Sequence, residues 1–265
     1  KGIILICGGI SSTAFPISAD PTAVSCESIL DEEPVLMKMP EELQFMVNAR
    51  LPQKRTEARL DGKVCVLTGA TSGVGYSAAH RLARSGAHLV LVCRDRNKAE
   101  ALQQELQREY GVTVEVIQAD FSHLEQVRTA AETILAAHPR LDILINNAGL
   151  HNTHRRLTED GLEMVFCVNH LASFLLTRLL LPRLLESTPA RILQVNSQGH
   201  RFGGLDLDDL DWERRRYRGL QGYGASKVAQ LLTVWELADR LEGTDVTINA
   251  TYLGAARSCI GIESR

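Results

Sequence analysis

A tyrosine and a lysine four residues apart, Tyr223 and Lys227, form the most chemically suggestive pair in the sequence. Residues at this spacing share one face of a helix, one turn apart. The pair can therefore hold a phenol beside an ammonium, whose positive charge favours the phenolate and so helps proton transfer. A Tyr/Lys pair on a helix face is also commonly no more than packing and solvation. Its interpretation depends on the motifs that precede it.

A glycine-rich turn, TGATSGVG over residues 68–75, follows an apolar strand-like run and opens a helical pattern. Glycine lets the backbone turn sharply and lets a ligand approach it, and the helix N-terminus supplies N–H donors for a pyrophosphate. The spacing Gly-x-x-x-Gly-x-Gly differs from Gly-x-Gly-x-x-Gly, and a purely structural turn is the alternative. The residues predicted to contact a dinucleotide are Gly69, Thr71, Ser72, Gly73, Val74 and Gly75.

Polar residues at the ends of the next two predicted strands indicate which cofactor is bound. Arg94 stands where an acidic residue would bind a ribose 2′-hydroxyl, and an arginine there suits the 2′-phosphate of NADP(H). This favours NADP(H) over NAD(H), although Asp95 weakens the signal and a solvated arginine is the alternative. Asp120 could accept a hydrogen bond from an adenine amino group, or it could cap the helix that begins near Ser122.

A short motif of small and amide residues ends the fourth predicted strand, at residues 146–149. Asn147, Ala148 and Gly149 are expected at the carboxyl edge of the sheet, where ligands bind in this architecture. Small side chains there would let the cofactor lie close to the backbone, although a turn would also explain Asn-Ala-Gly. Together, and in this order, the motifs predict a site that binds a nicotinamide cofactor and moves a proton beside it.

Apolar strand-like runs alternate with helical patterns from about residue 60 onward. This alternation predicts a Rossmann-type, doubly wound parallel sheet with helices on both faces. The predicted strands cover 63–68, 88–93, 113–118, 141–145, 191–195 and 246–252, and the predicted helices cover 73–85, 98–110, 123–137, 162–181 and 223–241. The leucine-rich run 171–185 is interrupted by charge and by Pro182, which indicates a buried or subunit-interface helix rather than a membrane span.

Composition excludes several classes of partner. A net charge of −3 over 265 residues, with mixed signs, predicts no nucleic-acid partner. The dense basic run 213–216 is interpreted as a solvated loop. Six cysteines without a Cys-x-x-Cys pair favour a reducing compartment, with Cys65 and Cys93 in buried strands. His151 and His154 lack partners at ligand spacing, so no metal site is predicted.

The sequence predicts two regions, an irregular or flexible extension over 1–59 and a dinucleotide-binding and catalytic domain over 60–265. The apolar run near Ile4 is too short to span a bilayer. Ser18-Ala19 is a weak cleavage context, so targeting or membrane association through the N-terminus is the alternative to a cytoplasmic location.

These motifs are similar to those of the short-chain dehydrogenase/reductase family, in particular its retinol-dehydrogenase-like and WW-domain-oxidoreductase-like members. The resemblance runs from about Leu60 to Ile262 and includes the segments LTEDGLE at 157–163, VNH at 168–170 and HRF at 200–202. It implies an oxidoreductase that interconverts an alcohol and a carbonyl, with a retinoid- or steroid-like lipophilic substrate. It also implies a homodimer formed through the helices at 162–181 and 223–241.

The resemblance implies a catalytic tetrad of Asn169, Ser197, Tyr223 and Lys227. Tyr223 would exchange a proton with the substrate oxygen, and Ser197 would hydrogen-bond that oxygen. Lys227 would supply positive charge and bind the nicotinamide ribose, so Tyr223 and Lys227 count as cofactor-binding residues too. Asn169 would hold a water that links Lys227 to solvent.

Two features depart from the family pattern. Leu253 stands where the family usually has proline, and the sequence ends at Arg265, where members usually continue with a substrate-covering segment and a seventh strand. The expected fold is therefore cut after its sixth predicted strand, which could leave that strand as an exposed edge. A non-catalytic, truncated isoform or fragment is the alternative function. An epimerase or dehydratase of the same fold is a third reading, which Ser197 with Tyr223 and Lys227 disfavours.

Overall fold

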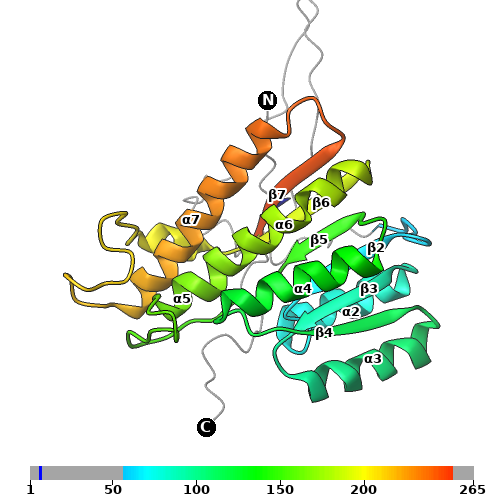
Figure 1. The fold of residues 1–265 in the computed structure, drawn as a ribbon, viewed down its shortest axis with the longest axis horizontal. Coiled ribbons are helices and arrows are strands. Elements are labelled where there is room, and N and C mark those ends of the chain that lie inside the picture. Colours follow the sequence, from blue (N-terminus) through cyan, green and yellow to red (C-terminus); the bar gives the residue numbers. More distant parts are fainter. Residues whose placement is uncertain (1–5, 8–55, 253–265) are drawn as a thin grey trace, which may run out of the picture.

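Parallel strands form a single sheet in the order β1-β7-β6-β5-β2-β3-β4 in the computed structural model, which describes residues 6–7 and 56–252 (Figure 1). The strands are β1 Ile6–Cys7, β2 Val64–Thr68, β3 His88–Cys93, β4 Val114–Gln118, β5 Ile143–Asn146, β6 Ala190–Asn196 and β7 Val246–Tyr252. The helices are α2 Gly73–Arg84, α3 Arg96–Tyr110, α4 Leu124–Ala137, α5 Met164–Phe166, α6 Ala172–Glu186 and α7 Gly219–Arg240, with the π-helical η2 Cys167–Leu171 and the 3-10 helix η3 Gln198–Phe202. The predicted doubly wound sheet and its six strands are confirmed.

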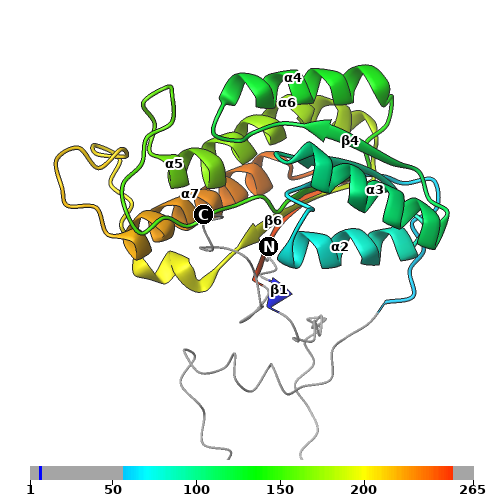
Figure 2. The ribbon, with the colours of Figure 1, turned by 90° about the horizontal axis from the view of Figure 1, so that it is seen from below.

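Successive side chains of a strand belong to two hydrophobic clusters, one on each face of the sheet. On β3, Val90 and Val92 join a cluster with α4, α6 and α7, whereas Leu89 and Leu91 join a second cluster with α2 and α3. Successive strand residues point to opposite faces, so apolar residues at every position must be covered on both sides. Figure 2 shows α4 and α6 on one side of the sheet and α2 on the other.

The chain reverses its direction of sheet growth between β2 and β5. It runs outward from β2 through β3 to β4, then returns to place β5 against the free side of β2. Ligands of open α/β sheets bind at the carboxyl ends of the strands beside such a reversal. The glycine turn after β2 and the Asn147–Gly149 segment after β5 therefore lie at the position where a cofactor is expected.

The two long helices differ from their predicted bounds. The helix expected over 162–181 begins at Met164, contains the π-helical segment and continues through Pro182 to Glu186. The helix expected to start at residue 223 begins at Gly219. Its glycines weaken helix propensity but permit close packing, because a Cβ on Gly222 would lie 2.6 Å from the Tyr217 hydroxyl and one on Gly224 would lie 2.5 Å from the Gly203 carbonyl oxygen.

One helical stretch among the described residues, Met164–Glu186, is long and apolar enough to cross a membrane by length and composition. Of its most apolar window, 61% is buried inside the protein. Leu176, Leu180 and Leu184 are fully buried in the core shared with α4 and α7. The stretch thus packs as the buried helix that the sequence predicts.

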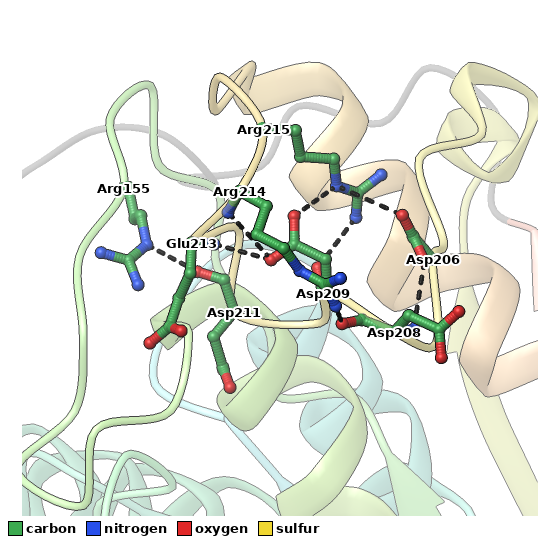
Figure 3. A network of polar contacts seen from close by, with 8 residues as sticks. All are labelled: Arg155, Asp206, Asp208, Asp209, Asp211, Glu213, Arg214 and Arg215. Carbon is green, nitrogen blue, oxygen red and sulfur yellow. Dashed lines mark hydrogen bonds and ion pairs between the residues drawn. The ribbon is translucent and has the colours of Figure 1, made fainter.

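The basic run lies in a solvent-exposed loop before α7, as predicted, and this loop is organised around a buried aspartate (Figure 3). Asp209 accepts backbone hydrogen bonds from Glu213 and Arg214, and its carboxylate pairs with Arg215 at 3.2 Å. The Arg215 guanidinium also lies 3.8 Å from the Trp212 ring centroid. Part of the basic run therefore stabilises the loop through these contacts.

Several predictions concern residues outside the described ranges. They concern most of the extension over 1–59, the Ser18-Ala19 context, and Leu253 with the residues after it. Of the extension, only Ile6–Cys7 and residues 56–59 are described. Strand β1 pairs in parallel with the carboxyl end of β7, at Thr251 and Tyr252. Part of the outer edge of β7 is thereby covered.

Candidate functional site

The glycine turn has no room for side chains at two of its positions. Gly69 has φ of +67°, and a Cβ there would lie 2.8 Å from the Ala148 Cα. A Cβ on Gly75 would lie 2.1 Å from the Gly69 carbonyl oxygen and 2.5 Å from the Asn147 Nδ2. These contacts bring the turn after β2 directly against the segment after β5.

Hydrogen bonds fasten the same two segments to each other. Thr68 Oγ1 accepts from the backbone N–H groups of Asn147 and Ala148 at 3.0 and 2.9 Å. The Asn147 side-chain amide donates to the carbonyl oxygens of Thr68 and Gly69 at 3.0 and 2.9 Å. Asn147 and Ala148 therefore fix the shape of the turn, a role that their position at a strand end did not reveal.

The N-terminus of α2 presents the donors that an anion needs. Its cap residue, Ser72, has an extended backbone and makes no side-chain capping bond, and the first turn carries no acidic residue. Gly73 has φ of +55°. The first N–H groups of a helix lack intrahelical acceptors, and the helix dipole favours negative charge there. Thr71, Ser72 and Val74 thus line a helix start that fits a phosphate.

Arg94 and Asp95 separate into different roles. Asp95 caps α3 and accepts from the Lys98 backbone N–H at 3.1 Å, so its carboxylate is already engaged. Arg94 is exposed at the end of β3. The acidic neighbour that weakens the sequence signal for NADP(H) is therefore occupied by helix capping, and the arginine side chain is accessible to a ligand.

Asp120 follows β4 and forms a local turn. Its Oδ1 accepts from the backbone N–H and the hydroxyl of Ser122, at 2.9 and 2.8 Å. The N-cap of α4 is His123. The predicted helix-capping role of Asp120 is therefore wrong, because its carboxylate stabilises the turn before the helix instead, while adenine binding remains a prediction.

Tyr223 is held beside Ser197 on the carboxyl side of β6. Burial raises the pKa of Tyr223 above its usual value, and a hydrogen bond with Ser197 offsets part of that rise. A Cβ on Gly199 would lie 2.5 Å from Cε1 of the tyrosine ring, so η3 packs against the phenol. The His151 ring meets the Tyr223 ring edge-on at 5.6 Å between centroids.

Lys227 is almost completely buried one helical turn from Tyr223. Its Nζ lies 5.5 Å from the centroid of the Tyr223 ring and donates to the Val195 carbonyl oxygen at 3.1 Å. Burial penalises the charged form and lowers the pKa of Lys227 to about 7. The predicted pairing of phenol and amine is therefore present, and the pKa of the amine is lowered toward neutral pH.

Asn169 connects this pair with the cofactor side of the site. It lies in η2 and is fully buried, and its side chain exchanges two hydrogen bonds with the backbone of Leu150. Its Nδ2 also donates to the Ser226 hydroxyl at 3.0 Å. A Cβ on Gly149 would lie 3.2 Å from its Oδ1. Residues 147–149, Asn169 and α7 thus form one continuous set of contacts.

Two residues that the sequence analysis did not assign to the site belong to it. Gln230 accepts from Lys227 Nζ at 2.9 Å and donates to the Asn169 backbone carbonyl at 2.5 Å. Its spacing of three from Lys227 places it on the same helix face, a signal that could have identified it. The sequence suggests only a metal-binding role for His151, whereas its ring packs against Tyr223. Its buried Nε2 has no hydrogen-bond partner among the described residues.

Comparisons with known proteins agree with this geometry. The short chain dehydrogenase family model matches residues 63–208. Human retinol dehydrogenase 13 is 42% identical over 218 residues, which cover 82% of this chain and 65% of that protein. Mouse retinol dehydrogenase 12 is 43% identical over 204 residues, covering 77% of this chain and 64% of that protein. The chain thus spans slightly less than two thirds of the length of these relatives.

Solved structures show the same fold. An uncharacterised protein from Mycobacterium paratuberculosis has a TM-score of 0.67 and 38% identity, covering 75% of this chain and 70% of the other. A short-chain dehydrogenase from Sphingobium yanoikuyae in complex with NADPH has a TM-score of 0.63 and 31% identity, covering 75% and 73%. With the glycine turn, the Ser197–Tyr223–Lys227 grouping and the family match in agreement, the chain belongs to the short-chain dehydrogenase family of oxidoreductases.

Proposed function

We propose that this chain is an NADP(H)-dependent oxidoreductase that interconverts an alcohol and a carbonyl. The observation that carries the proposal is the grouping of the Tyr223 phenol with Ser197 and the buried Lys227 amine. Asn169 and residues 147–149 connect this grouping with the glycine turn. A proton-transfer group and a dinucleotide cradle thus belong to one continuous structure.

The described residues fit NADP(H). The turn at Gly69 and Gly75 has space that any Cβ would fill, and we call it the dinucleotide cradle. The N-terminus of α2, which has no side-chain cap, suits the pyrophosphate. Arg94 is exposed at the end of β3 and would pair with the 2′-phosphate. Asp120 would accept from the adenine amino group through the carboxylate oxygen that Ser122 does not use.

When bound, the nicotinamide supplies or accepts the hydride. In the reducing direction, Tyr223 donates its proton to the substrate oxygen while Ser197 donates a hydrogen bond to the same atom. In the oxidising direction, Tyr223 must be a phenolate, which burial opposes and a protonated Lys227 favours. Burial raises the pKa of Tyr223, so the phenol is the form present at neutral pH and is the form needed to donate a proton to a carbonyl oxygen.

A lipophilic substrate, retinoid- or steroid-like, is proposed for this site. Relatives at about two fifths identity carry the name retinol dehydrogenase. Phe202 and Leu207 are exposed in the segment that leads from Ser197 to α7. Exposed apolar side chains in the segment that connects Ser197 with α7 suit an apolar substrate body better than a charged one.

Turnover of lipophilic carbonyls tests the proposal directly. The 265-residue chain would be assayed with NADPH against retinaldehyde and a steroid ketone, with Tyr223→Phe as the matched variant. We expect NADPH oxidation by the wild type and a fall of at least about 100-fold in kcat for Tyr223→Phe, with NADPH binding retained. NADPH binding without turnover by the wild type would favour the non-catalytic alternative.

We also propose a domain organisation, a location and an oligomeric state for this chain. Residues 60–265 are proposed to act as one unit behind an extension over 1–59, and the location is proposed to be cytoplasmic. A homodimer through the long helices is supported by exposed apolar side chains on both of them, and sedimentation of the purified chain tests it. These side chains are Phe174 and Leu185 on α6 and Leu232 and Trp235 on α7.

A further inference from the structure

A cluster of two histidines and a glutamate lies at the end of the sheet opposite the glycine turn. His88 is the first residue of β3, Glu115 is the second residue of β4, and His138 directly follows α4. Glu115 is paired with Val90, which faces the core beneath α4. His88 is two residues before Val90 and so points to the same face. The topology therefore brings all three side chains together beneath the end of α4.

The side chains present their ligand atoms to one another. His88 Nε2 lies 2.6 Å from one carboxylate oxygen of Glu115, and His138 Nε2 lies 3.5 Å from the other. The two imidazole rings meet edge-on with 5.3 Å between centroids. One ligand atom from each residue lies within 4.8 Å of the other two. Small side-chain rotations would place all three atoms around one ion.

The buried nitrogen of His138 is not accounted for by hydrogen bonds among the described residues. Its side chain is only 6% exposed, and Nε2 is buried without a hydrogen-bond partner. Leaving such an atom unsatisfied costs about 1–3 kcal/mol. The bond between His88 and Glu115 satisfies those two residues but not His138. A cation shared by the three side chains would satisfy all of them.

We propose that His88, Glu115 and His138 bind a divalent transition-metal ion, with Zn²⁺ as the best match. Imidazole nitrogens and a carboxylate oxygen are the ligand set that suits Zn²⁺. His88 and Glu115 are 27% and 40% exposed, so the ion can enter from solvent and keep a water as its fourth ligand. Binding replaces the proton shared between His88 and Glu115, which leaves to solvent.

The ion would act as a clamp rather than in the redox reaction. It would link the starts of β3 and β4 to the end of α4, far along the strands from Tyr223 and Lys227. This site was not predicted from the sequence, because its residues come from three separate elements and form no short motif. The proposal is independent of the proposed oxidoreductase activity.

A second cluster of the same residue types supplies a matched control. His80 lies near Glu105 through Nε2 at 3.6 Å and near Glu109 through Nδ1 at 3.8 Å. Its Nδ1 also lies 3.1 Å from the Tyr110 hydroxyl. His80 Nε2 is also buried without a hydrogen-bond partner among the described residues, but this cluster offers one imidazole and two carboxylates, one of them exposed. That set matches Zn²⁺ less well than two imidazoles and a carboxylate do. We therefore expect no tight metal site at His80.

The test is calorimetric titration of the full 265-residue chain with Zn²⁺ after removal of bound metal by a chelator. We expect one Zn²⁺ per chain and a higher Tm with Zn²⁺. Glu115→Gln and His138→Ala should each weaken binding by at least about tenfold, because each removes a ligand. His80→Ala should bind as the wild type does.

Because Glu115 is partly exposed, Glu115→Gln should fold even if His138→Ala does not, and its cooperative thermal transition verifies this. Absence of Zn²⁺ binding by the wild type would overturn the proposal. Unchanged binding in folded Glu115→Gln would overturn it as well, as would loss of binding in His80→Ala.

Discussion

Lys227 and Gln230 form a direct hydrogen bond inside α7, in which Lys227 Nζ donates to Gln230 Oε1 at 2.9 Å. Gln230 is fully buried and turns its Nε2 to the backbone carbonyl of Asn169. The π-helical segment that contains Asn169 breaks the regular α-helical bonding pattern there. Gln230 is therefore a positioning residue that ties the amine to the Asn169 segment.

Replacing Gln230 with glutamate should raise the pKa of Lys227, because a carboxylate beside the amine favours its charged form. The measurement is an NMR titration of Lys227 in protein carrying isotope-labelled lysine. Gln230→Leu should instead lower the free energy of unfolding by about 1–3 kcal/mol, since it leaves buried polar groups unsatisfied. An unaltered Lys227 titration in Gln230→Glu would show that the residue does not control the amine.

Burial of Lys227 predicts a specific dependence of stability on pH. Its pKa is about 7 in the folded chain and near the ordinary value of 10.5 when unfolded. Between these values the unfolded state binds more protons, so stability rises with pH, by up to about 1.4 kcal/mol per unit. Below about pH 7 both states are protonated and the full penalty of burying the charge remains.

Lys227→Met removes this contribution. Urea unfolding at several values between about pH 7 and about pH 9 should show the stability of the wild type rising relative to that of the variant. A constant difference in unfolding free energy between the wild type and the variant over this pH range would mean that the pKa of Lys227 is not lowered in the folded chain.

Alanine substitutions at Gly69 and Gly111 distinguish the cost of backbone strain from the cost of lost close packing. Both have φ of +67°, so alanine at either position incurs about 1–2 kcal/mol of strain. A Cβ on Gly111 would meet nothing within 4 Å, whereas one on Gly69 would lie 2.8 Å from the Ala148 Cα. Gly69→Ala should therefore destabilise the chain more than Gly111→Ala and weaken NADPH binding, measured by urea unfolding and calorimetry. Equal losses of stability in the two variants would contradict the close packing of Gly69 against Ala148.

Gly199 leaves room for the Tyr223 ring, whose phenol we propose to be the proton-transfer group. An added Cβ would lie 2.5 Å from Cε1 of Tyr223 and must displace the ring. A displacement of about 1 Å can reduce kcat by about 100-fold, so we expect a loss of that order in Gly199→Ala with NADPH affinity retained. The double variant with Tyr223→Phe should lose no more than Tyr223→Phe alone. Additive losses would show that Gly199 acts elsewhere.

The fold was largely predictable because its signals are local. After its first residue, β3 is apolar at every position, and Gly86 follows the end of α2 with φ of +91°. The start of α7 was not predictable, because its glycines weaken helix propensity and only contacts with residues distant in sequence explain them. The loop organised by Asp209 was missed for the same reason.

The site divides along similar lines. Tyr223, Lys227 and the glycine turn follow spacings that the chemistry requires, so the sequence alone indicated them. The bonds between Thr68 and Asn147 depend on which strands become neighbours. The cluster of His88, Glu115 and His138 likewise forms only when β3, β4 and α4 are assembled.

Binding of NADPH and NADH to the 265-residue chain, measured by calorimetry for the wild type, Arg94→Asp and Arg96→Asp, tests the central claim most directly. Arg96 is a suitable control because it neighbours Arg94 but pairs with Glu100 at 2.7 Å. We expect the wild type to bind NADPH more tightly than NADH, and Arg94→Asp alone to lose about tenfold or more in NADPH affinity, as for a lost charge-assisted hydrogen bond. A folded wild type that binds neither cofactor, or an NADPH preference unchanged in Arg94→Asp, would contradict it.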